Sequence, residues 1–304
     1  SDFALWKNAP PEHIMRWQSP WGEGFPGWHI ECSAMSTKYL GKEFDIHGGG
    51  MDLQFPHHEC EIAQSTVCNH QMPARYWLHN NMITINGKKM GKSYNNVIKL
   101  SELFAGTHPI LEQAYAPSTV RFFILQSQYR STLDFSNEAL QASEKALRRL
   151  MDAYEWFMSF DLTANQTGDD QTLNQKVVKL VTEFDEFMND DINTAKVIAN
   201  MFELVPVINS LKDKHISATA LDSNTIALMK KQLSAFIVDI FGLQSSKADN
   251  NNKLEGVLQL LINIRKEAKQ RKDFVTSDKI RNELSALGVQ LKDEKDGGMS
   301  YTIQ

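Results

Sequence analysis

The stretch Asn86-Gly87-Lys88-Lys89-Met90-Gly91-Lys92-Ser93 places lysines on both sides of a Met-Gly pair in a polar segment. Glycine lets the backbone approach a ligand closely, and lysine is a compact charge that can follow phosphate oxygens as their charge shifts. The stretch therefore suits a mobile clamp on the triphosphate of ATP. Taken alone, the same residues are also explained by a lysine-rich surface turn.

Three segments upstream favour the ligand-binding interpretation. They are Gly27-Trp28-His29-Ile30-Glu31-Cys32, Asp45-Ile46-His47-Gly48-Gly49-Gly50-Met51-Asp52 and Phe55-Pro56-His57-His58-Glu59-Cys60-Glu61. The second segment predicts a strand that runs into a glycine turn, where backbone N–H groups can approach a nucleotide and Asp52 can bind a ribose hydroxyl. A tight turn that needs positive φ explains one or two of these glycines, and three less easily.

The same segments contain a candidate metal site. His57 and Glu61 are four residues apart and share one face of the helix expected after Pro56. Cys32 offers a thiolate from the end of a run that resembles a strand, and Zn²⁺ accepts such S, N and O ligands. Three ligands are fewer than four, however, and neighbouring residues compete for the assignment. An ordinary buried cysteine with capping histidines remains the alternative.

Bulk properties describe an ordinary globular chain. The 304 residues suffice for roughly two domains or more. With 42% hydrophobic and 23% charged residues and three cysteines, neither a membrane span nor a disulfide framework is expected, and a reducing cytoplasm is the default compartment. The net charge of −5 does not indicate nucleic-acid binding. A local basic group can still attract a polyanion, although a solvated helix face explains it equally well. The group comprises Arg265, Lys266, Lys269, Arg271, Lys272, Lys279 and Arg281.

Periodicity predicts an α/β region over residues 1–98 and helices beyond it. In the first region we expect a helix near His57–Val67 and β-like runs at Trp28–Ile30, Phe44–His47 and Met82–Ile85. In the middle region we expect a buried segment at Val120–Leu125, a helix that Ser136 caps and that runs to Phe160, and helices at Leu173–Met188, Thr194–Leu211 and Leu221–Phe241. After a linker at Gln244–Lys253, we expect helices at Leu254–Arg271 and Thr276–Leu287 and strands at Val289–Lys292 and Met299–Ile303. The three helices between Leu173 and Phe241 favour an antiparallel bundle whose apolar stripe is core.

These motifs closely resemble the cysteinyl-tRNA synthetases, which are class I aminoacyl-tRNA synthetases. The matching residues cover nearly the whole chain: Leu5-Trp6-Lys7, Ser19-Pro20-Trp21-Gly22, Pro26 to Met35, the Gly48 triplet, Phe55 to Ser65, the lysine loop, Tyr129-Arg130-Ser131, Leu133-Asp134-Phe135, Asn189-Asp190-Asp191-Ile192-Asn193-Thr194, Arg271-Lys272-Asp273-Phe274 and Asp278-Lys279-Ile280-Arg281. The resemblance implies a partial Rossmann-like class I catalytic domain of the α/β class, followed by an all-α helical bundle and a small α+β C-terminal domain.

The resemblance also implies four parts with different roles. Residues 1–98 would be the C-terminal half of the catalytic domain, 99–140 a stem-contact connector, 141–245 a tRNA-binding bundle and 254–304 an anticodon-binding domain. Lys89 to Ser93 resembles the KMSKS signature, whose lysines stabilise the pyrophosphate leaving group, with Gly91 in the position of its serine. The implied site residues are Lys89 and Lys92 for catalysis; Gly48, Gly50, Asp52, Lys89, Met90, Lys92 and Ser93 for ATP and the adenylate; Trp28 and His47 for the cysteine pocket; Cys32, His57 and Glu61 for zinc; and Arg265, Lys269, Arg271 and Lys272 for tRNA.

Two features of the family are missing from the chain: the HIGH motif and a fourth zinc ligand, both expected further upstream. We therefore expect the C-terminal two-thirds of a cysteine–tRNA ligase, inactive alone, whose parent is a cytoplasmic monomer. That parent would use one Zn²⁺ and ATP with Mg²⁺, and would bind L-cysteine and tRNA(Cys) but no membrane. Two alternatives stay open: a ligase that transfers cysteine to an amine, and a non-catalytic tRNA-binding module.

Overall fold

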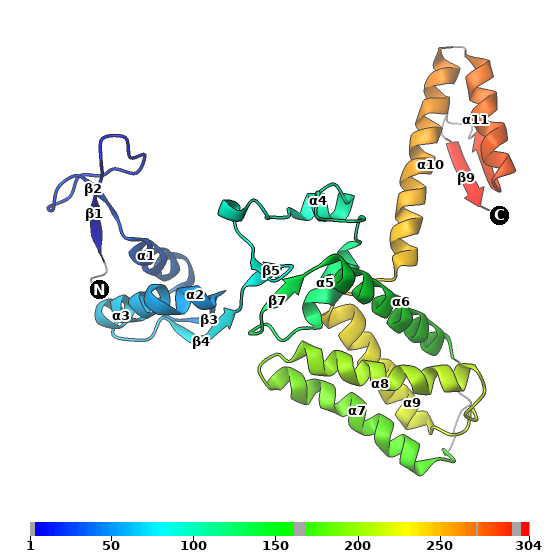
Figure 1. Ribbon diagram of the computed structural model, residues 1–304. Coiled ribbons are helices and arrows are strands. Elements are labelled where there is room, and N and C mark those ends of the chain that lie inside the picture. The colour runs from blue at the N-terminus through cyan, green and yellow to red at the C-terminus, as the bar shows by residue number, and fades with distance from the viewer. Residues whose placement is uncertain (1–3, 161–167, 272, 294–298, 304) are drawn as a thin grey trace. The chain divides into compact units, whose positions relative to one another are not determined.

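The structure of the protein, a computed structural model, describes residues 4–160, 168–271, 273–293 and 299–303 (Figure 1). It divides into two compact units, Ser1–Gly242 and Leu243–Gln304. Among the described residues, no helix is both long and apolar enough to cross a membrane.

The first unit begins with an α/β region. Its elements are β1 (Trp6–Asn8), β2 (Gly24–Pro26), α1 (Trp28–Leu40), β3 (Phe44–Gly50), α2 (Met51–Leu53), η1 (Gln54–His58), α3 (Glu59–Asn69) and β4 (Ala74–Asn80). Strands β3 and β4 are parallel, with Ile46 opposite Tyr76 and Gly50 opposite Asn80. Helix α3 makes the crossover between them and packs against α1. A parallel pair needs such a crossover, so the α/β prediction is confirmed.

Two local predictions in this region are wrong. Trp28–Ile30 begins helix α1 instead of forming a strand, because a short apolar run can bury itself in either form. The three glycines do not form a turn: they lie inside β3, and none has a positive φ. Close packing explains the glycine at position 49, since a Cβ there would lie 2.8 Å from the His58 ring.

A second layer of short strands carries the lysine stretch. Its elements are β5 (Ile83–Ile85), β6 (Lys88–Lys89), η2 (Lys92–Tyr94), α4 (Leu100–Ala105), α5 (Pro117–Leu125) and β7 (Leu133–Phe135), with strand order β6-β5-β7. Asn86 and Gly87 both have positive φ between β5 and β6, and this conformation matches the right-handed twist of a tight hairpin. The lysine stretch is therefore a β-hairpin followed by a 3₁₀ turn.

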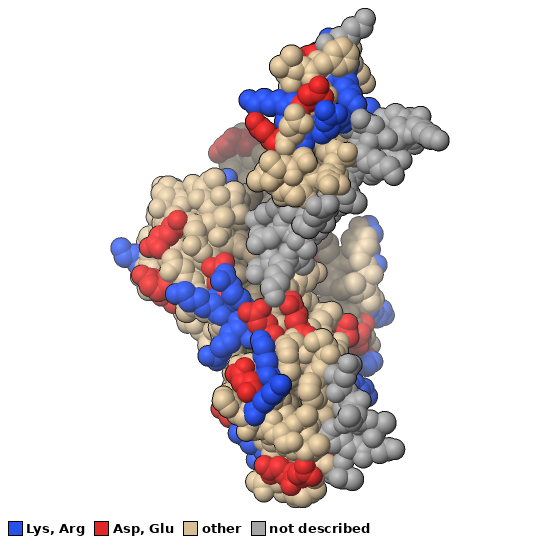
Figure 2. Space-filling model, turned by 90° about the vertical axis from the view of Figure 1, so that its right-hand side faces the viewer, with Lys and Arg blue, Asp and Glu red and all other residues tan. Residues whose placement is uncertain are grey.

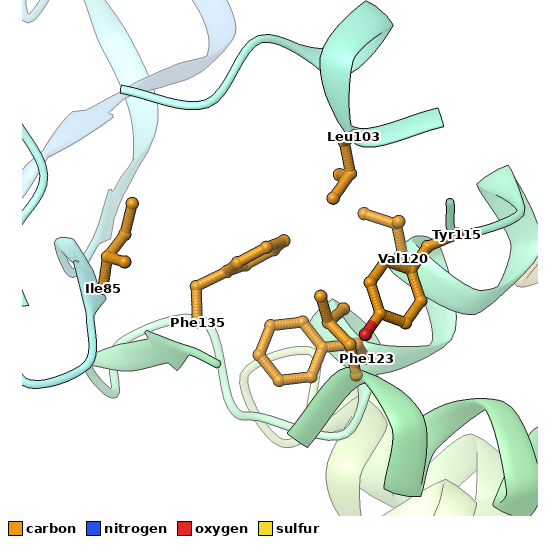
Figure 3. Close-up of a cluster of buried hydrophobic side chains, with 7 residues drawn as sticks. Ile85, Leu103, Tyr115, Val120, Phe123 and Phe135 are labelled. Atoms are coloured by element: carbon orange, nitrogen blue, oxygen red, sulfur yellow. The ribbon is translucent and has the colours of Figure 1, made fainter. Parts of the chain in front are cut away.

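One apolar cluster anchors this hairpin to the helices. Figure 3 shows Ile85 of β5 and Phe135 of β7 on one side of the cluster and Val120 and Phe123 of α5 on the other. The Phe123 and Phe135 rings meet edge to face, with centroids 5.4 Å apart. Burial of these side chains fixes β5 and β7, and therefore the base of the lysine hairpin.

The rest of the first unit is helical. It comprises α6 (Asn137–Ser159), α7 (Gln171–Asn189), α8 (Thr194–Lys212), α9 (Ser223–Ser234) and η3 (Ala235–Ile240). The Ser136 hydroxyl caps α6 by accepting from the Ala139 N–H at 3.2 Å, as predicted. Helix α7 packs against α8 and α9 (Figure 1). Of its predicted apolar stripe, Phe187 is half-buried and four members are buried: Val177, Leu180, Val181 and Phe184. The helical bundle is confirmed.

The second unit contains α10 (Ser246–Gln270), α11 (Phe274–Ala286), β8 (Val289–Asp293) and β9 (Met299–Ile303). Strands β8 and β9 pair antiparallel, which confirms the two predicted strands, and Gly288 has φ 82° after α11. The linker predicted at 244–253 is wrong from Ser246 onward, where α10 begins. Helix growth is cooperative, so a packed amphipathic segment extends at little cost into polar residues.

Candidate active site and metal centre

The three predicted metal ligands come together at the α1–α3 contact. Cys32 lies in α1, His57 lies in η1, and Glu61 lies in the first turn of α3. One donor atom from each residue lies within 4.8 Å of the others. His57 Nε2 is 3.0 Å from Glu61 Oε1, the expected contact between residues four apart on a helix. Cys32 reaches the pair from a helix and not from a strand.

Burial gives this site unusual electrostatics. Glu61 is only 2% exposed, and burial raises the pKa of its carboxyl to about 7. Burial also raises the pKa of the Cys32 thiol, with the Glu61 and Glu31 charges as smaller causes. The pKa of His57 is lowered, first by burial and then by the nearby His29. Without a cation, burial therefore favours the neutral forms of all three ligand side chains.

A second set of donors shares the same carboxylate. His47 Nε2 lies 3.4 Å from Glu61 Oε2, and donors of His47, His58 and Glu61 lie within 4.8 Å of one another. His58 Nδ1 is 2.8 Å from His79 Nε2. Burial, together with the neighbouring imidazoles, lowers the pKa of His58 to about 4. The lowered pKa values of His47 and His58 favour neutral imidazoles, whose ring nitrogens can act as ligands or acceptors.

The donor set fits a zinc ion. Glu61 Oε1 is buried and has no hydrogen-bond partner with proper geometry, which leaves an acceptor that a cation can satisfy. Cysteine, histidine and glutamate are the S, N and O donors that Zn²⁺ accepts. Trp28 stands over His57 with ring centroids 4.2 Å apart and remains 59% exposed. Trp28 thus contacts the ligand His57 and His47 contacts the ligand Glu61, and the cysteine pocket assigned to these two residues stays a prediction.

A separate cavity gathers several of the predicted nucleotide-binding residues. It has a volume of about 250 Å³ and is lined by Gly50, Asp52, Asn80, Asn81, Met82, Ile83, Lys89 and Met90. We refer to it as the nucleotide cleft. It lies at the carboxyl ends of parallel strands β3 and β4, the edge where open α/β sheets bind ligands. The sequence reasoning missed Asn80 and Asn81 because it did not predict β4.

Side-chain amides and carboxylates hold the lysine hairpin in place. The Asn96 side chain accepts from the Gly91 N–H at 2.9 Å and donates to the Lys89 carbonyl at 3.0 Å. Asp134 of β7 accepts from the Gly87 N–H at 2.7 Å and from the Thr84 hydroxyl at 2.6 Å. These contacts fix the hairpin backbone while its lysine side chains remain exposed.

The other predicted nucleotide residues lie elsewhere. Lys92 lines a different cavity, of about 540 Å³, with Lys99 and His108, so the two predicted catalytic lysines do not meet in this structure. Ser93 is exposed beside Lys92, and Gly48 lies inside β3 opposite Leu78.

The predicted tRNA-binding residues divide into exposed and buried members. Basic side chains interleave with acidic ones on the second unit, in the upper part of Figure 2. Arg271 is exposed and lies 3.6 Å from Glu267, and Lys269 is half-buried. Arg265 is 1% exposed because it shares the packed face of α10 with Leu258 and Ile262, and cannot reach a phosphate in this conformation. Lys272 lies outside the described residues.

Comparisons with known proteins identify the family. Residues 1–145 match the family of tRNA synthetases class I (C) catalytic domain, and residues 183–245 match the DALR domain. The chain belongs to the class I tRNA synthetases. The resemblance seen in the sequence is therefore confirmed, and the synthetase family accounts for the α/β region and the helical bundle together.

Several curated relatives of this synthetase chain share one name. Proteins named cysteine–tRNA ligase from Cytophaga hutchinsonii (52% identical over 297 residues), Bacteroides thetaiotaomicron (53% over 300) and Chlorobaculum tepidum (43% over 305) each cover 98% of the chain. The chain spans only 58–59% of their lengths. Among solved structures, the agnB2 LeuRS of Agrobacterium radiobacter K84, in a ternary complex with tRNA and LeuAMS, matches with a TM-score of 0.52 and 13% identity over 73% of this chain and 32% of that one. That likeness concerns the fold alone.

Proposed function

We propose that this chain is part of a cysteine–tRNA ligase, which activates cysteine with ATP and transfers it to tRNA(Cys). The observation that carries the proposal is the convergence of Cys32, His57 and Glu61 on one buried point beside an exposed tryptophan. The relatives' shared name supports the same reading. Because the chain spans about three fifths of those relatives, the proposal concerns the longer protein, and we expect this chain to be inactive alone.

The first step needs the reactants to be held in line more than it needs covalent help from the protein. The cysteine carboxylate attacks the α-phosphate of ATP and gives cysteinyl-adenylate and pyrophosphate. Lys89 lines the nucleotide cleft together with Gly50 and Asp52, so its ammonium can balance the charge that develops on the leaving pyrophosphate. Asp52 is available for a ribose hydroxyl. Mg²⁺ would accompany ATP as part of the substrate.

Cysteine would bind beside Trp28 and His47. When bound, zinc supplies a soft Lewis acid that accepts a thiolate far more readily than a hydroxyl, which would separate cysteine from serine. Cys32, His57 and Glu61 would hold that ion. Trp28 contributes an apolar wall above His57. The second step passes the acyl group to the terminal hydroxyl of tRNA. We assign its phosphates to two basic residues of the second unit, the exposed Arg271 and the half-buried Lys269.

The decisive experiment is ATP–pyrophosphate exchange with each amino acid in turn, on the full-length protein that contains this chain. Exchange with cysteine only is the expected result. Exchange with another amino acid would overturn the assignment of cysteine as the substrate. No exchange with any amino acid would overturn the proposal and bring forward a non-catalytic tRNA-binding module. Transfer of cysteine to an amine in place of tRNA would identify the second alternative.

Zinc analysis of paired variants adds a sharper test. Cys32→Ser should lose bound zinc and cysteine activation together, because serine is a poor zinc ligand. Cys68→Ser is the matched control, since Cys68 lies exposed on α3, away from the ligand set. Unchanged zinc content in the Cys32 variant would show that the metal assignment is wrong.

A further inference from the structure

The turn between α7 and α8 has an unusual backbone. Asp191 and Ile192 both adopt left-handed φ values, 59° and 54°. Isoleucine is β-branched and seldom adopts this region, and two such residues in succession are energetically unfavourable. Burial does not explain the conformation, because Ile192 is 43% exposed. Such strain persists only where surrounding contacts hold the backbone in place, so those contacts are the feature to explain.

The Asp191 carboxylate supplies these contacts. It accepts a hydrogen bond from the Tyr129 hydroxyl at 2.7 Å, pairs with Arg130 Nε at 2.7 Å and accepts from Gln128 Nε2 at 3.2 Å. A second tie lies close by, where the Thr194 hydroxyl donates to the Leu125 carbonyl at 2.7 Å. These contacts therefore attach the α7–α8 turn to the segment 125–130, which leads from α5 towards β7 (Figure 1).

That segment is bonded in turn to the wall of the nucleotide cleft. The Asn81 backbone N–H donates to the Tyr129 carbonyl at 2.9 Å, and its side-chain amide donates to the Arg130 carbonyl at 2.9 Å. The Asn81 side-chain oxygen accepts from the Met82 N–H at 2.8 Å. Asn81 and Met82 line the cleft beside Lys89. A continuous set of hydrogen bonds thus runs from the helical bundle to the cleft.

We propose that Asp191 is a positioning residue for nucleotide binding. It holds the Tyr129–Arg130 backbone, which holds Asn81 at the correct place in the cleft wall. The left-handed backbone of the turn is what brings the carboxylate to this position. The inference deepens the proposed function and rests on its assignment of the cleft to ATP. It assigns a role in ATP affinity to a residue of the bundle.

Two adjacent substitutions separate the carboxylate from the backbone strain. Asp191→Asn keeps the size of the side chain, and asparagine tolerates left-handed φ as well as aspartate does. Ile192→Gly removes the strain and leaves the Asp191 contacts in place. In the full-length protein, we expect Asp191→Asn to weaken ATP binding, measured by calorimetry, roughly fivefold. Ile192→Gly should bind ATP like the wild type and melt at a higher temperature.

A double-mutant cycle distinguishes positioning from general destabilisation. Asn81→Ala should weaken ATP binding, and adding Asp191→Asn to it should cause little further loss, because both act through one set of contacts. Cysteine affinity and melting temperature should stay near the wild-type values in Asp191→Asn. Unchanged ATP affinity in that variant, or additive losses in the double variant, would overturn the inference. Absence of amino-acid-dependent exchange in the wild type would instead overturn the proposed function, since ATP binding is measured separately.

Discussion

Replacing Glu61 with glutamine should raise the free energy of unfolding of the zinc-free protein and abolish the stabilisation that added zinc gives. Glu61 is 2% exposed, and its buried carboxyl has a pKa raised from 4.5 to about 7. The folded protein therefore holds this proton more tightly than the unfolded chain does. This tighter proton binding contributes to the free energy of unfolding. The contribution is fully present below pH 4.5 and is lost as the pH rises to about 7. Glutamine has the same size and carries no charge, so it avoids this loss.

The magnitude follows from the size of the shift. One pKa unit corresponds to ~1.4 kcal/mol, so the shift corresponds to roughly 3 kcal/mol above pH 7. Relaxation and water penetration lower the penalty of burying a charge, and we expect a difference of about 2 kcal/mol. Zinc at about 100 times its dissociation constant stabilises a folded protein by ~2.7 kcal/mol. Zinc binding is therefore strong enough to make the wild type more stable against unfolding than the Glu61→Gln variant.

Urea unfolding in the presence of a chelator, at pH 5 and pH 8, measures the first effect. The Glu61→Gln protein should be more stable than the wild type at pH 8 and nearly equal to it at pH 5. Adding zinc at pH 8 should stabilise the wild type and leave the variant unchanged. Glu59→Gln is the matched control, because Glu59 is exposed on the same helix and should show neither effect.

Two results would refute this reasoning. If Glu61→Gln lowers the stability of the zinc-free protein equally at both pH values, the carboxylate stabilises the fold through its contacts and is not a buried charge awaiting a cation. If zinc stabilises the variant as much as the wild type, Glu61 is not a ligand.

Three further predictions concern the full-length protein. Lys92→Ala should slow cysteine activation by roughly 100-fold while weakening ATP binding much less, and an equal fall in both would indicate simple ground-state binding. Asn96→Ala removes two hydrogen bonds that brace the lysine hairpin, each worth ~1 kcal/mol, and should lower the exchange rate roughly tenfold without a large change in melting temperature; normal exchange would contradict this. Reversing the charges of Lys269 and Arg271 should weaken tRNA binding and flatten its salt dependence by about two units of slope, whereas an unaltered slope would exclude phosphate contacts.

The sequence predicted the elements whose signals are local. Ser136 begins α6 because a serine hydroxyl caps the N–H groups that a helix start leaves free. The apolar stripe of α7 at Val177, Val181 and Phe184 is buried because its spacing matches the helical repeat. His57 and Glu61 meet because residues four apart on a helix are neighbours. Each of these features depends only on a few consecutive residues.

Packing decided the features on which the sequence was silent or wrong. The run at Trp28 is a helix because α1 packs against α3, and Arg265 is buried because it falls on the packed face of α10. Position 49 requires glycine because a Cβ there would lie 2.8 Å from the His58 ring. The helix–helix contact and the ring beside position 49 depend on how separate elements pack, so a propensity read from a few consecutive residues does not encode them.

For the site, the sequence by itself determined the residue types and, through the family's motifs, the kind of chemistry to expect. Only the tertiary structure decided which side chains meet. Lys89 lies with Asp52 in the nucleotide cleft while Lys92 faces another cavity, and Asp191 of the bundle reaches Tyr129 through a strained turn. The physical reason is that donor types are properties of single residues, whereas their distances depend on how separate helices and strands bury their apolar faces against one another.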